Sequence, residues 1–395
     1  MAQYELNTTQ IALLEALKAS LFGIEPNYPE DTDWAEVVKE AKAQTVMGII
    51  SPVIPVTDTS TKQGIAKYIQ ILHEQDKLIK LFDENDIPCV ILKGSAAAIY
   101  YPNPHLRTMG DVDILVSRSQ FNEASEIMEA NGYIYVQGKD DNGKRPEIGR
   151  HFEYHKNSVV FELHHHFSSV GFDVDDILEQ AICKPEYREL DGYMIPMLPD
   201  IENGLVLLGH IHIHLKHSNL GLRQVIDWQM YVHRVLDDDT WRNLFEPIVK
   251  SVGFDKLAVI TTKMCETFLG LPNDNSWCKN IDVRTSKELL SIILSSGNFG
   301  WKMYSSRSER HIHAAVYEIK QKGIHTFLKE LGLRKSKVCR NNPILNHFVW
   351  LYGLICFIYM GFLAVARTKN VRKRVLDVNE RLEILEELGL KDFSS

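Results

Sequence analysis

The sequence lacks a regular arrangement of cysteines and an excess of positive charge, and each absence excludes a class of protein. The six cysteines lie far apart, with no Cys-x-x-Cys pair. A zinc knuckle or a disulfide framework is therefore not expected, and a reducing compartment is favoured. The formal net charge of -8 gives no overall basic field, which argues against a protein that wraps nucleic acid over its whole surface. The first residues carry charges and helical periodicity rather than a secretion signal, so a cytoplasmic location is expected.

What is present is an ordinary globular composition. Of the 395 residues, 45% are hydrophobic and 24% are charged, which excludes a disordered or fibrous chain. This length exceeds the usual size of a single core, so two or three packed units are expected.

The order of apolar residues predicts a helical N-terminal part followed by a small sheet. From Leu6 onward apolar residues recur at helical spacing, and at Ile87 the pattern changes to a short apolar run that ends at Gly94, which indicates a buried strand. Further strands are expected at residues 111–116, 133–136, 152–155 and 159–167, and a helix is expected at 119–131 with Ser119 as its N-cap. A polar loop is expected at 138–149, and nearly everything after about Asp175 is expected to be helical.

This order indicates the α+β class, with a small mixed β-sheet core flanked by helical N-terminal and C-terminal regions. The predicted parts are a helical module at residues 1–85, the core at 86–172, a helical domain at 173–335, and an apolar helix with basic flanks and a C-terminal helix at 336–395.

Residues 348–366 contain no charged side chain and have Lys and Arg residues on both sides. Such a length can cross a bilayer. Two glycines, two tyrosines and the basic flanks are equally compatible with a core helix or with a helix that lies on a membrane surface and contacts anionic lipid. The sequence leaves these alternatives open, and peripheral membrane contact through 348–366 is one expected partnership.

The strongest chemical signal is a pair of aspartates two residues apart, Asp111 and Asp113, inside an apolar strand. Side chains at positions i and i+2 of a strand point to the same face, so the two carboxylates are expected side by side. Without a partner they would repel each other, whereas a pair of hard divalent cations would neutralise them and use their oxygens as ligands. The pair therefore predicts a metal site.

Gly94 and Ser95 precede this pair at a predicted strand-to-helix turn. Backbone N–H groups at such a turn suit a phosphate, and the Ser95 hydroxyl would add one hydrogen bond. Lys93 and Arg107 would neutralise phosphate charge. Gly-Ser alone is a weak motif, but together with the aspartate pair it predicts a nucleotide site.

A third carboxylate is expected on a neighbouring strand, where Glu162 is framed by apolar residues. Glu153 is a rival that fits an exposed strand position equally well, and Glu162 is preferred. His164 and His166 share the face of Glu162 by the period of two, so they are expected to line the pocket or to bind substrate.

Two further groups have simpler explanations. The first is a set of closely spaced histidines, His210, His212, His214 and His217. They lack a nearby acidic ligand at zinc spacing, which favours helix packing or a substrate pocket over a zinc site. The second is Arg223 and Asp227, four residues apart on a predicted helix. They either pair with each other, or Arg223 turns into the cleft and contacts nucleotide or acceptor.

The combination of Gly-Ser, Asp-x-Asp and a later strand acid resembles the nucleotidyltransferase superfamily of the DNA polymerase β and MNT types. A closer similarity is to an uncharacterised bacterial nucleotidyltransferase family, and it rests on residues 92–94, 107–116 and 162–164. It covers roughly residues 40–240 and takes in His210, His214, Arg223 and Asp227. One departure is His165, where tryptophan is expected.

The resemblance implies an enzyme that transfers a nucleoside monophosphate from a nucleoside triphosphate, such as ATP, to an acceptor hydroxyl and releases pyrophosphate. Two Mg²⁺ ions would be held by the catalytic residues Asp111, Asp113 and Glu162. The nucleotide would be bound by Lys93, Gly94, Ser95, Arg107, His164 and Arg223.

The acceptor stays open among an RNA end, a protein, a sugar and a small molecule such as an antibiotic, although the acidic chain disfavours a long nucleic acid. The alternatives are a catalytically inactive protein that binds nucleotide or a membrane surface, and a toxin-like enzyme that modifies tRNA.

Overall fold

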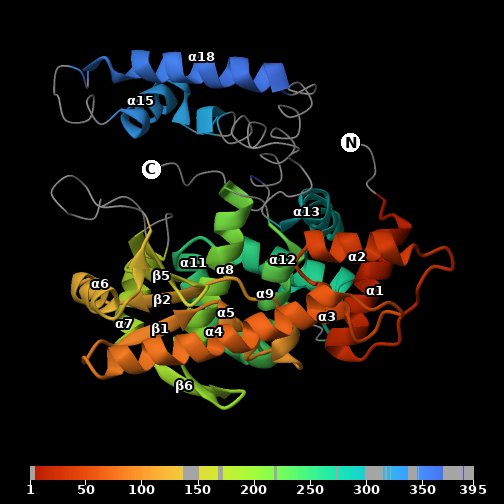
Figure 1. Cartoon of the computed structure of the whole chain (residues 1–395). Helices are drawn as coiled ribbons and strands as arrows, with labels where there is room; N and C mark the ends of the chain where they lie inside the picture. Colours follow the sequence, from red (N-terminus) through yellow and green to blue (C-terminus); the bar gives the residue numbers. More distant parts are fainter. Residues whose placement is uncertain are drawn as a thin grey trace. The chain divides into compact units, whose positions relative to one another are not determined.

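The computed structural model describes residues 5–136, 151–167, 172–217, 220–272 and 275–298, together with 315, 318–320, 322–336, 345, 347–367 and 386. The chain divides into two compact units, Met1–Phe299 and Gly300–Ser395, whose elements are drawn in Figure 1. The finer division into four parts stays a prediction, and the loop expected at 138–149 lies outside the described residues.

Helices form the N-terminal part of the first unit, as the sequence predicts. They are α1 (Thr8–Phe22), α2 (Trp34–Ala43), α3 (Met47–Ile50) and α4 (Thr59–Asp83). Asn7 and Gln10 form a capping box at the start of α1, and the Asp58 carboxylate caps α4, so backbone N–H groups at both helix starts find acceptors. Helix α4 buries an apolar stripe that includes Leu72 and Phe82, which fixes its packing against the rest of the unit.

A mixed sheet follows, formed among the described residues by β1 (Cys89–Leu92), β2 (Val112–Val116), β3 (Ile134–Tyr135), β4 (His151–Lys156) and β5 (Val159–His164). The order across the sheet is β1-β2-β5-β4-β3. Strands β2 and β5 are parallel, and the other neighbouring pairs are antiparallel. This confirms the predicted α+β class with a small mixed sheet, although several strand ends differ by one to three residues from the predicted ones.

A two-residue turn sets the register of the β4–β5 hairpin. Asn157 and Ser158 have φ angles of 49° and 62°, the left-handed conformation that a type I′ turn requires. Counting outward from this turn, His151 pairs with His164, and Glu162 lies on the same face because side chains alternate along a strand. The turn therefore gathers polar side chains from both strands on one face.

The opposite face of the hairpin is apolar and packs against α6 (Phe121–Ala130). Phe152 contacts Phe121 with ring centroids 4.7 Å apart, and the hydroxyls of Tyr154 and Ser125 are hydrogen-bonded. The alternation along β4 and β5 thus separates a core face from a polar face.

The N-cap expected for α6 is wrong. The N-cap is Gln120, which makes no side-chain capping hydrogen bond. The Ser119 hydroxyl instead lies 3.0 Å from the Ser117 hydroxyl. Ser119 therefore belongs to the turn that leads into the helix.

A second correction concerns the region after Asp175, where nearly continuous helix is expected. Strands β6 (Glu186–Leu190) and β7 (Tyr193–Met197) form an antiparallel pair there. Asp191 and Gly192 join them with φ angles of 48° and 85°. Asp-Gly is a preferred pair for a type I′ turn, so local turn chemistry overrides the helical tendency.

The remaining elements of the first unit are mostly helical, as expected. Helices α5 (Gly94–Ala98) and η1 (Pro104–Leu106) connect β1 to β2, and α7 (Phe172–Ala181) follows β5. The C-terminal helices are α8 (Asp200–His217), α9 (Leu222–Val235), α10 (Asp238–Thr240), η2 (Trp241–Phe245), α11 (Glu246–Ser251), α12 (Asp255–Phe268), η3 (Ser276–Cys278) and α13 (Val283–Ser296). A Cβ atom at Gly204 of α8 would clash with Tyr231 of α9, so glycine there permits close packing of the two helices.

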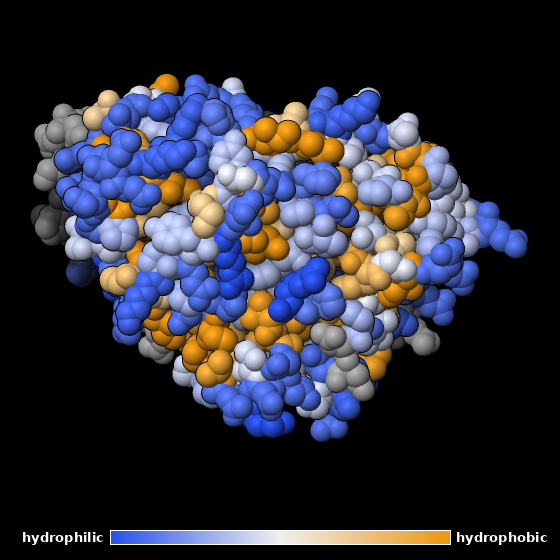
Figure 2. Space-filling model, turned by 90° about the horizontal axis from the view of Figure 1, so that it is seen from below, coloured by the Kyte–Doolittle hydropathy of each residue, from blue (hydrophilic) through white to orange (hydrophobic). Residues whose placement is uncertain are grey.

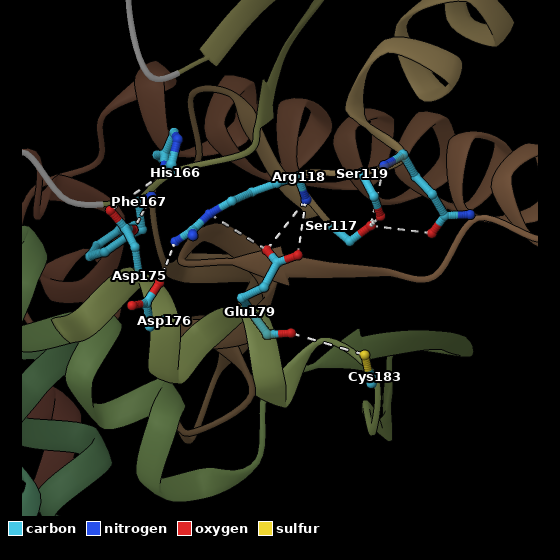
Figure 3. A network of polar contacts seen from close by, with 10 residues as sticks. Ser117, Arg118, Ser119, His166, Phe167, Asp175, Asp176, Glu179 and Cys183 are labelled. Atoms are coloured by element: carbon cyan, nitrogen blue, oxygen red, sulfur yellow. Dashed lines mark hydrogen bonds and ion pairs between the residues drawn. The ribbon is translucent and has the colours of Figure 1, made fainter. Parts of the chain in front are cut away.

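A polar network attaches α7 to the ends of the two central strands (Figure 3). The backbone N–H of Arg118, just after β2, donates to Glu179 at 3.1 Å, and the Arg118 guanidinium pairs with Asp176 at 2.9 Å. The backbone N–H of Phe167, just after β5, donates to Asp175 at 2.7 Å. One helix thereby holds the chain that leaves both strands.

In the second unit, α15 (Ile324–Lys335) packs against α18 (Val349–Arg367). Phe327, Leu328 and Leu331 are buried between them. Gly332 and Gly353 lie where an added Cβ would clash with a backbone carbonyl of the other helix, so the two backbones approach closely.

Large hydrophobic side chains are exposed on both units. Figure 2 shows hydrophobic residues intermixed with hydrophilic ones on the face seen from below. In the second unit most of the exposed large apolar residues lie on α18, whose side chains beyond Tyr359 lie outside the described residues. Among the described residues, no helix is both long and apolar enough to span a membrane.

Candidate active site

Three acidic residues meet where β2 and β5 run parallel. Asp111 directly precedes β2, Asp113 is its second residue, and the register places Asp113 beside Glu162 of β5. Residues paired in this way share a face. Asp113 is buried and the Glu162 side chain is 22% exposed, so the group is open to solvent on one side.

Lys93 lies among these carboxylates. It follows Leu92, which pairs with Asp113 across β1 and β2, and its φ of 52° is unusual for a residue with a side chain. Its Nζ lies 2.8 Å from Asp113 Oδ1. Burial lowers the pKa of Lys93, but the nearby carboxylates outweigh burial and leave its pKa raised. We predicted that Lys93 binds phosphate; in the structure it forms an ion pair with Asp113.

His164 is the second partner of Asp113. Its Nε2 lies 3.0 Å from Asp113 Oδ1 and 3.3 Å from Glu162 Oε2. Burial lowers the pKa of His164, but these two hydrogen bonds outweigh it, so the pKa is raised. Burial likewise raises the pKa of Asp113, yet Lys93 and His164 bring it below its usual range.

His151 is a site residue that the sequence analysis missed. It begins β4, and its Nε2 lies 3.6 Å from Glu162 Oε1. Burial, together with nearby charged groups of both signs, leaves the pKa of His151 lowered. Counting back from the Asn157-Ser158 turn would have placed His151 opposite His164, so the hairpin register is the signal that could have found it.

The charge of the cluster suits a bound cation. The negative charge of Asp113 is the largest cause of the raised pKa of Asp111, followed by burial. Three carboxylates around one lysine leave an excess of negative charge, and their oxygens are the donors that hard divalent cations prefer. The residues present therefore fit a divalent ion.

Two predicted nucleotide ligands are held by other residues. The Ser95 hydroxyl is buried and donates to Gln75 Oε1 of α4 at 2.8 Å, so it fixes the turn at Gly94, where φ is 41°. Arg107 is buried and forms a two-bond ion pair with Asp227 at 2.7 Å for each bond. These contacts hold both side chains on partners outside the carboxylate cluster.

Arg223 acts electrostatically on the cluster. Asp227 forms its ion pair with Arg107 and not with Arg223, the partner that one of the two alternatives expected. Arg223 Nη1 donates to the Thr108 carbonyl at 3.2 Å, and its positive charge lowers the pKa of Asp111. Burial, followed by the charge of Arg107, lowers the pKa of Arg223 itself. Contact of Arg223 with nucleotide or acceptor stays a prediction.

The other polar candidates lie around this group. Glu153 pairs with Glu162 in the hairpin register, one strand farther from Asp113, and accepts a hydrogen bond from His155 at 2.8 Å. His166 lies 3.6 Å from Asp175. His165 packs on Phe121 of α6, with ring centroids 4.2 Å apart, rather than among the carboxylates.

The α8 histidines divide between two faces. His210 and His214 lie 2.9 Å apart through their Nε2 atoms, and the ring of His212 packs against Phe254. Burial, followed by the charge of Lys93, lowers the pKa of His210 well below its usual value. His210 therefore stands within electrostatic range of the site.

Comparison with known proteins gives the family. Residues 30–270 match the family described as "Uncharacterised nucleotidyltransferase", which extends beyond the predicted range of 40–240 at both ends. Among solved structures, the crystal structure of ANT(2")-Ia in complex with adenylyl-2"-tobramycin is similar, with 11% identity and a TM-score of 0.31 over 46% of this chain and 97% of that one. The solution structure of the antibiotic-resistance factor ANT(2")-Ia is also similar, with 11% identity and a TM-score of 0.31 over 48% of this chain and 96% of that one. No curated protein matches the chain. Because the family match spans more than half of the sequence, the chain belongs to this nucleotidyltransferase family and is a transferase.

Proposed function

We propose that the protein transfers a nucleoside monophosphate from a nucleoside triphosphate to an acceptor hydroxyl and releases pyrophosphate. The observation that carries the proposal is the meeting of Asp113 of β2 and Glu162 of β5 with Asp111, which directly precedes β2. This reaction needs carboxylates that hold divalent ions beside the triphosphate. Membership of the family supports the reaction class.

Asp111, Asp113 and Glu162 would hold Mg²⁺, two ions in the full arrangement, because carboxylate oxygens are its preferred protein ligands. Bound Mg²⁺ would neutralise triphosphate charge and stabilise the departing pyrophosphate. The excess negative charge around Asp111 supports this assignment.

The side chains would share the remaining tasks. The acceptor oxygen forms a bond to the α-phosphorus while the bond from that phosphorus to the bridging β-oxygen breaks, and Glu162 would take the acceptor proton. Lys93, the Gly94 backbone and Arg223 would bind phosphate oxygens, and His164 would orient the carboxylates it contacts.

Ser95 and Arg107 would support nucleotide binding indirectly, by holding the elements that carry the phosphate-binding residues. Ser95 holds the Gly94 turn through its bond to Gln75, and Arg107 holds α9 through its ion pair with Asp227. ATP is the first nucleotide to test. The acceptor stays open among an RNA end, a protein, a sugar and a small molecule, and the net charge of -8 disfavours a long nucleic acid.

The test is isothermal titration of the full chain with each nucleoside triphosphate, with and without Mg²⁺. Wild-type protein should bind in a Mg²⁺-dependent way, and Asp111→Asn/Asp113→Asn should bind about tenfold more weakly or worse, which corresponds to a loss of about 1.4 kcal/mol. Transfer of label from the α-phosphate to a panel of acceptors would follow.

Glu153→Gln is the matched control, because it removes a carboxylate from the same face one strand away. It should bind nucleotide as the wild type does. If wild-type protein does not bind, or if the double variant binds equally well, the proposal gives way to a protein without this catalytic site.

We further propose that residues 348–366 make a peripheral contact with an anionic membrane surface. One side of α18 packs on α15. On the other side large apolar side chains are exposed by 39–64%, namely those of Leu351, Tyr352, Ile355, Ile358 and Tyr359, together with Phe348 just before the helix. An apolar helix face of this kind usually marks an interaction surface. Residues 331–376 contain nine Lys and Arg and no Asp or Glu, which matches the negative charge of anionic lipid.

Flotation of the full chain with phosphatidylcholine vesicles, with and without phosphatidylglycerol, tests this contact. The wild type should float with the anionic vesicles, and Ile355→Glu/Ile358→Glu should not. Leu244→Glu, at a leucine that is 54% exposed in the first unit, is the control and should still float. Failure of the wild type to float, or an equal loss in the control, would contradict the contact.

A further inference from the structure

We propose that His151, Glu162 and His164 form a site for a transition-metal ion, with Zn²⁺ the best fit, beside the Asp111–Asp113 pair. The proposal deepens the proposed function, on which the catalytic meaning of the shared Glu162 rests. The metal site itself rests on the positions of the three side chains.

The hairpin register brings the two imidazoles together. His151 of β4 and His164 of β5 are directly opposite each other, with ring centroids 5.0 Å apart. Glu162 lies two residues before His164, so its carboxylate is on the same face. Strand pairing therefore holds all three side chains, and none depends on a loop.

The distances from Glu162 to the two imidazoles match those between ligands of a four-coordinate ion. His164 Nε2 lies 3.3 Å from Glu162 Oε2, and His151 Nε2 lies 3.6 Å from Glu162 Oε1. One ligand atom from each residue can be chosen so that all lie within 4.8 Å of one another. Metal bonds of about 2.0–2.2 Å in a tetrahedron place neighbouring ligand atoms roughly 3.4 Å apart.

The contacts of the two histidines with the carboxylates differ in length. His164 is within hydrogen-bonding distance of Asp113 and Glu162, whereas the 3.6 Å between His151 and Glu162 is too long for a hydrogen bond. A cation at the centre would hold both imidazoles and the carboxylate together.

The chemistry of the donors selects the ion. Two imidazoles and one carboxylate form the ligand set of many catalytic zinc sites, which keep a fourth position for water or substrate. Imidazole favours Zn²⁺ over Mg²⁺, which prefers oxygen donors. The His151 and Glu162 side chains are 32% and 22% exposed, so an ion can enter from solvent.

The test uses the full chain after treatment with a chelator. Titration should show one Zn²⁺ bound per chain through these residues, with Mg²⁺ binding far more weakly. Co²⁺ in place of Zn²⁺ should give the intense visible absorption of a four-coordinate ion. A weak six-coordinate Co²⁺ spectrum from the wild type would overturn the proposal without any variant.

His151→Asn should weaken Zn²⁺ binding by about 100-fold or more, because loss of even an outer-shell partner costs roughly 10–100-fold. His155→Asn is the matched control, since His155 lies on the same strand and face and should have no effect. His214→Asn tests the imidazole pair on α8 as a competing site. If Zn²⁺ binding is unchanged in His151→Asn, or is lost only in His214→Asn, the site is wrong.

Nucleotide transfer is measured separately. Asp111→Asn should abolish transfer but keep the Co²⁺ spectrum, because Asp111 is not in the ligand set. No transfer by the wild type, with its Co²⁺ spectrum intact, would contradict the proposed function and leave the metal site standing. Normal transfer by the wild type, without a bound metal ion that depends on His151, would contradict the metal site and leave the proposed function standing.

Discussion

At the scale of single residues, the site is a buried ion pair between Lys93 and Asp113 within a cluster that carries excess negative charge. Lys93 and Asp113 side chains are only 15% and 4% exposed, and their charged atoms lie 2.8 Å apart. Loss of one partner of such a pair strands the other charge in a poorly solvated place, whereas loss of both partners removes the problem.

This argument predicts the metal-free stability of three variants. Lys93→Met leaves the buried carboxylates without their lysine and should lower the free energy of unfolding by about 3–5 kcal/mol, and Lys93→Met/Asp113→Asn should recover at least about 2 kcal/mol of that loss. Urea denaturation in the presence of chelator measures both. Lys39→Met, which removes an exposed partner of Glu36, should change stability by less than about 0.5 kcal/mol. A double variant no more stable than Lys93→Met would show that the two charges do not compensate each other.

A second residue-scale prediction concerns acid stability. Burial, followed by the nearby His166 and His164, lowers the pKa of His165 to about 4, compared with about 6.5 in an unfolded chain. Between these values the unfolded chain binds more protons, so the stabilising contribution is fully present above pH of about 6.5 and is lost as the pH falls toward 4.

His165→Phe keeps the packing on Phe121 and removes this titration. The decrease in unfolding free energy between pH 7 and pH 4 should therefore be about 1 kcal/mol smaller than in the wild type, a value reduced for the half-exposed position. Urea denaturation at both pH values measures it. If the decrease in unfolding free energy is the same in His165→Phe as in the wild type, His165 is not held in its neutral form. His155→Asn serves as the exposed control.

The sequence was informative about some site residues and silent about others for a physical reason. Asp111, Asp113 and Glu162 follow from the period of two along a strand, which needs no knowledge of distant contacts. The partners of Ser95 and Arg107 are Gln75 and Asp227, and these lie on separate helices. Spacing along the chain carries no information about such contacts.

At the scale of elements, the main strands were predictable and the turn chemistry was overlooked. The apolar runs that form β1, β2 and β5 stand out because these strands are largely buried. The β6–β7 hairpin was missed, although Asp191-Gly192 is a strong local turn signal. His151 was missed because the register of the β4–β5 hairpin was not counted from its turn.

The same turn gives a prediction for the β4–β5 hairpin. Ser158 has a φ of 62°, at the turn position where glycine is preferred. Ser158→Gly should relieve this strain and raise the free energy of unfolding by about 0.5–1 kcal/mol, measured by urea denaturation. Ser60→Gly, in the first turn of α4, should not stabilise the protein. A fall in stability for Ser158→Gly would mean that the turn is not strained.

At the scale of the whole molecule, the chain combines a first unit that carries the carboxylates with a second unit built on a helical pair. The family match ends at residue 270, so the second unit lies beyond it. The α15–α18 pair depends on glycine because an added Cβ at Gly353 would meet the backbone carbonyl of Leu328. Backbone atoms cannot turn aside as a flexible side chain can, so the helices would have to separate.

Gly353→Ala should therefore loosen the second unit by about 1–3 kcal/mol or more. Limited proteolysis should cut α15 and α18 faster, while Mg²⁺-dependent nucleotide binding by the first unit stays unchanged. Gly64→Ala is the matched control, because an added Cβ there meets no atom within 4 Å in the interior of α4. That change should stabilise the first unit by about 0.5–1 kcal/mol through helix propensity. Equal protection of α15 and α18 in both variants would mean that the close approach at Gly353 does not hold the pair together.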